Sequence, residues 1–304
     1  MKQRIKKISI GLLKTAFAFG ALAYVLHQTD LEEVKSNIIN SDPTYLLLAY
    51  ISLNCATFLG SLRLKTYFAE ENMKLPESYA IVIYYIGLFF NTVLPGGIGG
   101  DGYITLHLRH KYAFPALKII RILLSTRANG LFFLNLFFFV AAWNSDFVNI
   151  VPHAKLIIIG LLILQMPVYF LVSRLVLKEK FRTFLKAGFF SFTSQIFSLA
   201  TAYFAFRACG VVDGYADYLA LYMAAAVVAV LPITPGGVGL RELILYKGAV
   251  IAGLDPHLAV AGSLTYFAVY FATSLTGLAL YLLSNKLKLH SREVQNGTDG
   301  NTTS

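Results

Sequence analysis

The sequence predicts an all-α polytopic membrane protein with about six full membrane spans and two re-entrant hairpins made of broken helices. Three observations support this fold class. Of the 304 residues, 57% are hydrophobic and only 14% are charged, against roughly 25% charged in a typical soluble chain. The apolar residues form stretches close to the ~20 residues that cross a ~30 Å hydrocarbon layer. The basic residues, 26 Lys and Arg against 16 Asp and Glu, cluster between those stretches. These observations exclude a soluble enzyme and a basic domain for nucleic acid.

Six apolar stretches are long enough, or nearly so, to be full spans. The first starts after a basic segment and is interrupted by Lys14. We therefore expect an uncleaved anchor there, although a basic start followed by an apolar run also resembles a secretory signal. In chain order, the predicted spans cover residues 8–27, 45–62, 122–143, 156–172, 188–206 and 258–283.

Two further apolar regions, 79–103 and 218–254, are broken near their middle by Pro-Gly-Gly motifs. Proline and glycine end helices because proline lacks a backbone donor and glycine adopts the left-handed conformation that closes a helix. Each region is therefore expected to be two half-helices. The alternative is a bundle of eight or nine ordinary kinked spans.

The charges of the loops favour the re-entrant alternative. Residues 1–7 and 104–121 each carry four Lys or Arg with no Asp or Glu, and 174–187 carry five with one Glu, whereas 28–44 carry one Lys and four acidic residues. Basic loops face the cytoplasm. The alternation holds only if neither broken region crosses the membrane. The first would enter from the cytoplasm and the second from outside, with both chain termini cytoplasmic.

The broken regions contain an internal repeat. Pro95-Gly96-Gly97-Ile98-Gly99 recurs 140 residues later as Pro235-Gly236-Gly237-Val238-Gly239. Broken helices at matching positions of two halves, here an inverted repeat, indicate a transporter binding site. Non-helical backbone in a membrane must be buried in protein or line a cavity. The half-helices that follow, near Gly102 and Leu240, would point positive dipole ends into that cavity, which suits a lipid phosphate. The alternative is a pair of tight interfacial turns.

Charged residues close to these breaks are the candidate headgroup contacts. Ionisable groups in apolar segments usually face an interior path. We expect Arg127 and Arg241 to bind a phosphate, and Asp101 and Glu242 to orient them or carry a coupling proton. These charges could instead form buried ion pairs that only fix the packing. Arg63 and Arg121 are expected to reach headgroups at the cytoplasmic interface.

The two motifs together resemble the transmembrane-region family of lysylphosphatidylglycerol synthases. The resemblance covers residues 1 to about 285 and depends on Asn91-Thr-Val-Leu-Pro95-Gly-Gly-Ile-Gly-Gly-Asp101 and Leu231-Pro-Ile-Thr-Pro235-Gly-Gly-Val-Gly-Leu-Arg241-Glu242. It implies a flippase-like domain that moves lipids. Family members commonly have an Arg after the first Gly-Gly-Asp and a Glu-Arg pair in the next span; this chain has Gly102-Tyr103-Ile104 and Thr126-Arg127. The predicted substrate-binding residues are Asn91, Pro95, Gly96, Gly97, Gly99, Gly100, Asp101, Arg127, Pro235, Gly236, Gly237, Gly239, Arg241 and Glu242.

The sequence therefore predicts a lipid transporter that moves a phosphate-bearing phospholipid or lipid-linked substrate. Residues 1–285 form its single transmembrane domain, and residues 286–304 a polar, disordered cytoplasmic tail. The expected membrane is the cytoplasmic membrane of a bacterium or archaeon. We expect no cofactor and no metal, and as partners anionic lipids, a separate synthase or a glycosyltransferase, but not nucleic acid. The alternative function is a membrane enzyme or accessory subunit that uses Asp101 or Glu242 as a base on a lipid-linked substrate.

Overall fold

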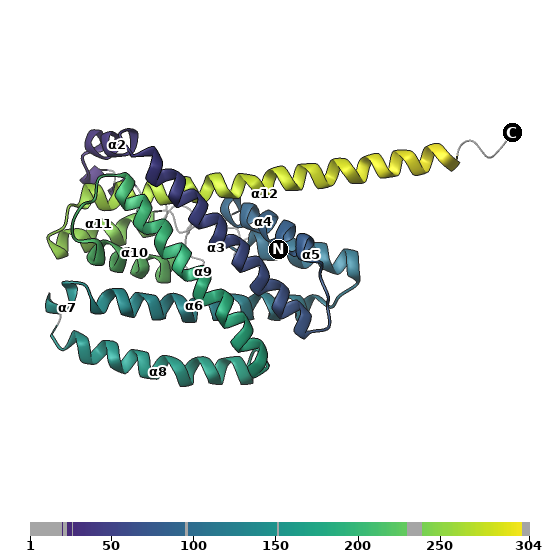
Figure 1. Cartoon of the computed structure of the whole chain (residues 1–304), viewed down its shortest axis with the longest axis horizontal. Coiled ribbons are helices and arrows are strands. Elements are labelled where there is room, and N and C mark those ends of the chain that lie inside the picture. Colours follow the sequence, from purple (N-terminus) through teal and green to yellow (C-terminus); the bar gives the residue numbers. More distant parts are fainter. Residues whose placement is uncertain are drawn as a thin grey trace, which may run out of the picture.

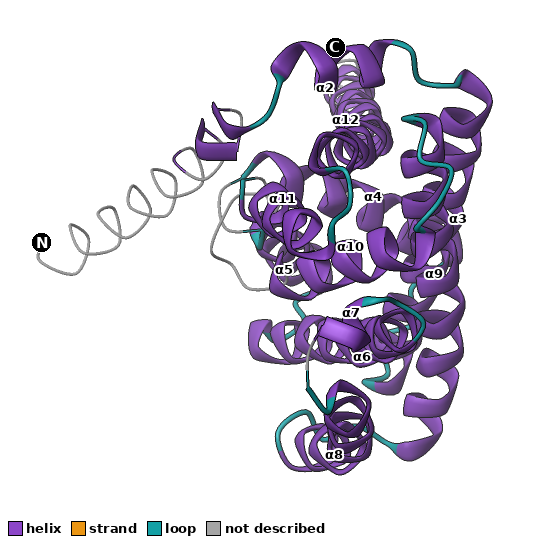
Figure 2. Cartoon of the chain, turned by 90° about the vertical axis from the view of Figure 1, so that its left-hand side faces the viewer, coloured by secondary structure: helices purple, strands orange, loops and turns teal. Residues whose placement is uncertain are grey.

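The computed structural model describes Gly20 and residues 23–25, 27–94, 97–150, 152–229 and 239–299, with side chains up to Ser284 except at positions 147 and 150. Every regular element within those ranges is a helix (Figures 1 and 2), which confirms that the fold is all-α as predicted. The six full spans and the re-entrant hairpins stay predictions. The helices are α2 Leu31–Ile39, α3 Pro43–Glu70, α4 Glu77–Val93, α5 Gly99–Tyr112, α6 Ala116–Trp143, α7 Phe147–Ile150, α8 Ala154–Leu175, α9 Phe181–Ala208, α10 Tyr215–Ala229, α11 Leu240–Ala252 and α12 Pro256–Asp299.

Among the described residues, five helices are long and apolar enough to cross a membrane: α3, α6, α8, α9 and α12. They correspond to five of the six predicted spans. Most of the first predicted span, 8–27, lies outside the described residues. Helix α12 continues through residues 286–299, within the stretch that we expect to be a polar tail, and the disorder of that tail stays a prediction.

The two broken regions are pairs of shorter helices, as the Pro-Gly-Gly motifs predict. The first pair is α4 with α5, and the two pack against each other. The second is α10 with α11, which also pack together. Of the residues between the paired helices, Pro95, Gly96 and 230–238 are outside the described part of the chain.

Contacts between helix ends show that α4 begins where α5 ends, at one end of the bundle. Lys65, near the end of α3, forms an ion pair with Glu77 at the start of α4, with 2.9 Å between Nζ and Oε2. Arg121, near the start of α6, pairs with Glu71 at the end of α3. Because only residues 113–115 separate α5 from α6, α5 ends beside the start of α4.

Helices α10 and α11 have the same relation at the opposite end. The amide of Asp42, before α3, donates to the carbonyl of Ala208 at the end of α9, 3.0 Å away. Residues 209–214 lead from there to α10. The Tyr218 hydroxyl of α10 donates to the carbonyl of Asp255, 3.1 Å away, directly after α11. The two half-helix pairs therefore start and finish at opposite ends of the bundle.

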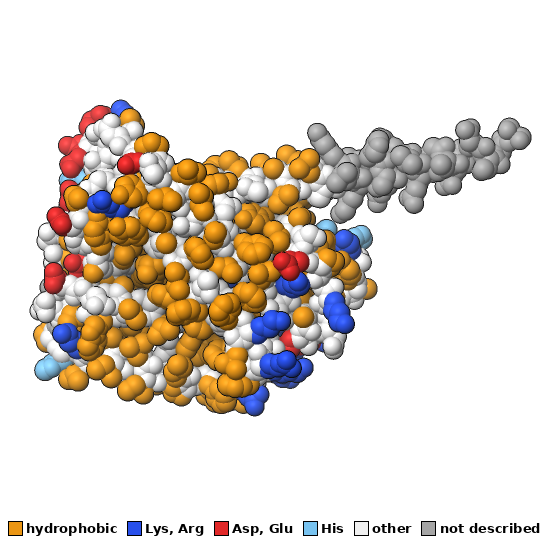
Figure 3. Space-filling view, viewed as in Figure 1, with side chains coloured by type: hydrophobic (Ala, Val, Ile, Leu, Met, Phe, Trp, Pro, Cys, Tyr) orange, Lys and Arg blue, Asp and Glu red, His pale blue; other side chains and the backbone are white. Residues whose placement is uncertain are grey.

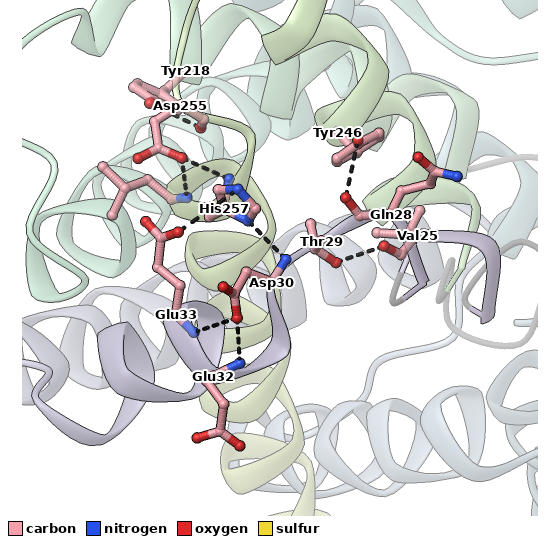
Figure 4. A network of polar contacts seen from close by, with 11 residues as sticks. Val25, Gln28, Thr29, Asp30, Glu32, Glu33, Tyr218, Tyr246, Asp255 and His257 are labelled. Carbon is pink, nitrogen blue, oxygen red and sulfur yellow. Dashed lines mark hydrogen bonds and ion pairs between the residues drawn. The ribbon is translucent and has the colours of Figure 1, made fainter.

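A polar cluster around His257 fastens the short helix α2 to this second end (Figure 4). The Asp30 amide donates to His257 Nδ1 at 3.2 Å, and His257 Nε2 lies 3.7 Å from a carboxylate oxygen of Glu33. Asp30 also caps α2 by accepting from the Glu32 and Glu33 amides. Capping satisfies amides that the first turn leaves without a partner.

The two ends of the bundle differ in charge. In Figure 3, most Asp and Glu side chains gather at the end with α2, and most Lys and Arg side chains gather at the end where α3 meets α4. Hydrophobic side chains cover the surface between them. The face in view therefore has the charge asymmetry that the loop composition predicts.

Helix α3 packs along α9 through small residues. The Ser194 hydroxyl of α9 donates to the carbonyl of Ala56 in α3, 3.0 Å away, so the two backbones approach closely. Small side chains allow such contact between membrane helices. The buried small residues are Ala49, Ser52, Ala56, Thr57, Gly60 and Ser61 of α3 and Ala187, Gly188, Ser191, Ser194, Thr201, Ala202, Ala205 and Ala208 of α9.

Candidate functional site

A cavity of about 390 Å³ lies between the two half-helix pairs and is lined by eight helices. Residues on both sides of the first break and of the second break contribute to its wall. Among the described lining residues, three are arginines and one carries a carboxylate. Its polar and charged lining residues are Arg63, Tyr84, Asn91, Asp101, Thr126, Arg127, Gln195, Ser198, Tyr222, Arg241, Tyr266 and Tyr270.

The first break is held in shape by Asn91 and by glycines. Asn91 Oδ1 accepts a hydrogen bond of 2.9 Å from the Gly100 amide in the first turn of α5. Gly97 has φ +62°, which favours glycine because a Cβ is strained there. A Cβ on Gly100 would lie 1.9 Å from the carbonyl oxygen of Gly87. The sequence therefore allows α5 to start directly against α4.

Asp101 and Arg127 form an ion pair on the cavity wall. Arg127 Nε donates to Asp101 Oδ2 at 2.6 Å, and its Nη2 donates to the Gly97 carbonyl at 2.8 Å. Both side chains stay partly exposed, 34% for Arg127 and 25% for Asp101. The pair thus joins α6 to the first break and leaves polar atoms open to the cavity.

The second break places Arg241 in the same cavity. Gly239, with φ +84°, precedes α11. The guanidinium carbon of Arg241 lies 5.4 Å from the centre of the Tyr266 ring and 5.9 Å from that of Tyr222. Such cation–π contacts hold an arginine without neutralising it. Its Nε is buried and has no hydrogen-bond acceptor among the described residues.

Glu242 does not line the cavity in the described structure. Its side chain is 1% exposed. One carboxylate oxygen accepts from the Gly239 amide at 2.6 Å, and the other accepts from the Ser263 hydroxyl of α12 at 2.8 Å. The structure therefore places Glu242 as a cap of α11 that ties this helix to α12, and its predicted role in substrate binding stays a prediction.

Arg63 is a cavity arginine whose burial its local sequence does not predict. The expectation that it reaches headgroups at the interface is wrong, because α3 continues to Glu70 and Arg63 faces the bundle interior. It is 8% exposed, and its Nη1 donates to the Ser191 hydroxyl at 2.9 Å. Gly130 of α6 leaves room for it, since a Cβ there would lie 3.0 Å from Nη1.

The structure brings together six of the predicted site residues at or beside the cavity: Asn91, Gly97, Gly99, Gly100, Asp101 and Arg127 from the first half. From the second half it adds Arg241, which lines the cavity, and Gly239, which precedes it. The remaining predicted residues, Pro95, Gly96, Pro235, Gly236 and Gly237, lie outside the described residues.

Residues 11–277 match the sequence profile of a family described as the lysylphosphatidylglycerol synthase TM region. A search of curated proteins finds no match to this chain. The family match covers most of the chain and includes both broken regions. Together with the five apolar helices, it identifies the chain as an integral membrane protein.

Proposed function

Because this chain belongs to the lysylphosphatidylglycerol synthase TM-region family, we propose that it is a lipid transporter that moves a phosphate-bearing lipid headgroup across the membrane. The observation that carries the proposal is the cavity, which places Arg63, Arg127 and Arg241 together between apolar spans. Guanidinium groups match phosphate oxygens in two places at once. Charged groups within membrane segments usually mark a substrate path.

The arrangement of the half-helix pairs supports an alternating mechanism. Helices α4 and α5 start and finish at the basic end, and α10 and α11 at the acidic end. We propose that each pair is re-entrant, with the basic end in the cytoplasm. The headgroup then lies where the two pairs meet, and movement of one pair against the other opens the cavity to either side.

Reconstitution tests the proposal. The purified chain is placed in liposomes that contain lipids with a fluorescent label on the acyl or prenyl chain, and headgroup movement is followed by quenching of the outer-leaflet label. A panel of anionic phospholipids and prenyl phosphates is needed because the lipid is unidentified. We expect faster quenching with the protein than in empty liposomes, with the extracted lipids chemically unchanged. Altered lipids would instead indicate the membrane enzyme.

Substitutions of cavity residues test whether the lipid movement depends on the cavity. We expect Asp101→Ala and Arg241→Ala each to slow transport at least about tenfold, the effect of losing one charge-assisted contact. Arg207→Ala is the matched control, because Arg207 lies at the end of α9, contacts the Tyr45 and Tyr215 hydroxyls, and is not a described cavity residue. Undiminished transport by the Asp101 and Arg241 variants, at equal expression, would contradict the site.

A further inference from the structure

The cavity wall has more positive than negative charge. Among the described lining residues there are three arginines, Arg63, Arg127 and Arg241, and one carboxylate, Asp101, so the formal sum is 3 − 1 = +2. Asp101 already pairs with Arg127. The two remaining positive charges are therefore those of Arg63 and Arg241.

Among the described residues, Arg63 forms hydrogen bonds with neutral groups only. Its Nη1 donates to the Ser191 hydroxyl, which in turn donates to Asn129 Oδ1, and its Nε is buried without an acceptor among the described residues. This network continues through Tyr169 to Glu179, so three neutral side chains separate the arginine from that carboxylate. The described contacts therefore orient the Arg63 guanidinium toward the cavity without neutralising it.

The side chains described in contact with the Arg241 guanidinium are uncharged, and the neighbouring carboxylate of Glu242 acts on it through its charge without an ion pair among the described residues. The rings of Tyr222 and Tyr266 flank its guanidinium. The adjacent carboxylate, Glu242, forms its hydrogen bonds with the Gly239 amide and the Ser263 hydroxyl instead. Within the described part of the chain, Arg241 forms no ion pair.

Two guanidinium groups that line an interior cavity and form no ion pair among the described residues are costly in a low-dielectric interior. A ligand with one negative charge would leave one of them uncompensated. We propose that the transported headgroup carries two negative charges, as in a phosphate monoester or a diphosphate, and that Arg63 and Arg241 are its two cationic contacts. This inference rests on the proposed function, because it concerns the same cavity.

Binding to the full-length chain in phosphatidylcholine nanodiscs tests the charge. The probes are phosphatidic acid, a monoester, and phosphatidylglycerol, a diester, with identical acyl chains. At about pH 8 the monoester is doubly ionised, since such second pKa values lie near 6. We expect the wild-type chain to bind phosphatidic acid at least about tenfold more tightly than phosphatidylglycerol, the effect of one further charge-assisted contact. Farnesyl phosphate and farnesyl diphosphate, tested alongside, distinguish the monoester from the diphosphate.

The variants assign the preference to the two arginines. Arg63→Gln and Arg241→Gln should each lower the affinity for phosphatidic acid more than that for phosphatidylglycerol, so that the preference of at least about tenfold is lost. Arg63→Lys, which keeps the charge, should retain most of the preference and serves if the glutamine variant does not fold. Arg207→Gln is the control, because Arg207 also has a buried Nε without a partner among the described residues but is not a described cavity residue. It should leave both affinities unchanged.

The outcomes separate this inference from the proposed function. Equal wild-type affinities for phosphatidic acid and phosphatidylglycerol would overturn the double charge and leave lipid transport standing. An unchanged preference in both Arg63→Gln and Arg241→Gln would overturn the assignment of the contacts. Failure of the wild-type chain to bind or move any anionic lipid would overturn the proposed function itself.

Discussion

The three cavity arginines differ in their immediate neighbours, and this difference decides what each substitution should do. Arg127 has a carboxylate partner, Asp101, and a backbone acceptor at Gly97. Arg63 and Arg241 form no ion pair among the described residues, and their contacts there are a hydroxyl and aromatic rings. Removing the Asp101 carboxylate therefore leaves the positive charge of Arg127 without its partner. Removing Arg63 or Arg241 instead takes away a positive charge that has no ion-pair partner among the described residues.

This contrast predicts a coupling between Asp101 and Arg127. Asp101→Asn should destabilise the chain by about 1–2 kcal/mol, below the ~3–5 kcal/mol of a fully buried pair because both groups are partly exposed. Arg127→Gln added to Asp101→Asn should recover much of that loss. Unfolding of the single and double variants in detergent measures the coupling in a double-mutant cycle. Additive effects would mean that the ion pair contributes nothing to stability.

The candidate residues could be predicted where a charge interrupts an otherwise apolar stretch, as for Asp101, Arg127 and Arg241. Arg63 could not, because Leu62-Arg63-Leu64-Lys65 is equally consistent with the end of a span and with a helix that continues. Its burial depends on Gly130 and Ser191, which lie in two other helices. Such contacts between distant segments leave no local pattern in the sequence.

Among the elements, α4 and α5 depend on a close backbone contact at Gly100. A Cβ on this residue would lie 1.9 Å from the Gly87 carbonyl oxygen, an atom that cannot rotate away. Two residues further along α5, a Cβ on Gly102 would meet nothing within 4 Å. The two glycines of one helix therefore have opposite packing environments.

We expect Gly100→Ala to destabilise the chain by about 1–3 kcal/mol, the typical effect of overpacking. Gly102→Ala should be neutral or stabilise by up to about 1 kcal/mol, because alanine favours the helix more than glycine does. Thermal unfolding of both variants in the same detergent gives the comparison. Equal behaviour of the two would show that α4 and α5 do not approach as described.

The segment between α8 and α9 contains a buried carboxyl, Glu179, which is 4% exposed. The Tyr67 hydroxyl donates to it at 2.6 Å and the Tyr169 hydroxyl at 3.3 Å. No ion pair with Lys or Arg is present among the described residues. Burial raises the pKa of Glu179 above its ordinary value of 4.5, and the hydroxyl hydrogen bonds oppose only part of this rise.

A raised pKa means that the folded chain binds this proton more tightly than the unfolded chain does. The stability that Glu179 contributes is therefore complete below about pH 4.5, its ordinary value, and is lost as the pH rises through the raised pKa. Glu179→Gln imitates the protonated form and should flatten this part of the profile. Melting temperatures at a series of pH values test it, with the exposed Glu32→Gln as control. An unchanged pH profile in Glu179→Gln would contradict the effect of burial.

The long helices and the two breaks were predictable, because long apolar stretches and Pro-Gly-Gly motifs are strong local signals in the sequence. The short helices α2 and α7 were not: α2 lies in a segment rich in acidic residues, and the four residues of α7 are too few to show a helical pattern. Helix α2 depends on its Asp30 cap and on the contact of Asp30 with His257, 227 residues away. Helix ends were also missed where charged side chains remain inside the bundle, as at the end of α3.

In the whole molecule, the two half-helix pairs start at opposite ends of the bundle. This is the main consequence of the fold for the mechanism. The Lys65–Glu77 pair places the start of α4 at the basic end, and the Tyr218–Asp255 contact places the start of α10 at the acidic end. If both pairs are re-entrant, residues flanking one pair must all face the same side of the membrane. Ordinary spans would instead place them on opposite sides.

Cysteine labelling in intact cells distinguishes these topologies. In a chain with Cys55 and Cys209 replaced by serine, single cysteines are placed at Lys74, before α4, and at Arg109, near the end of α5; both positions are exposed. We expect both to react only after the membrane is made permeable, because the basic end faces the cytoplasm. A cysteine at Val212, which is 64% exposed at the acidic end, should react in intact cells. Opposite sidedness of positions 74 and 109 would mean that α4 and α5 together cross the membrane, so that the two breaks could not meet from opposite faces as the transport mechanism requires.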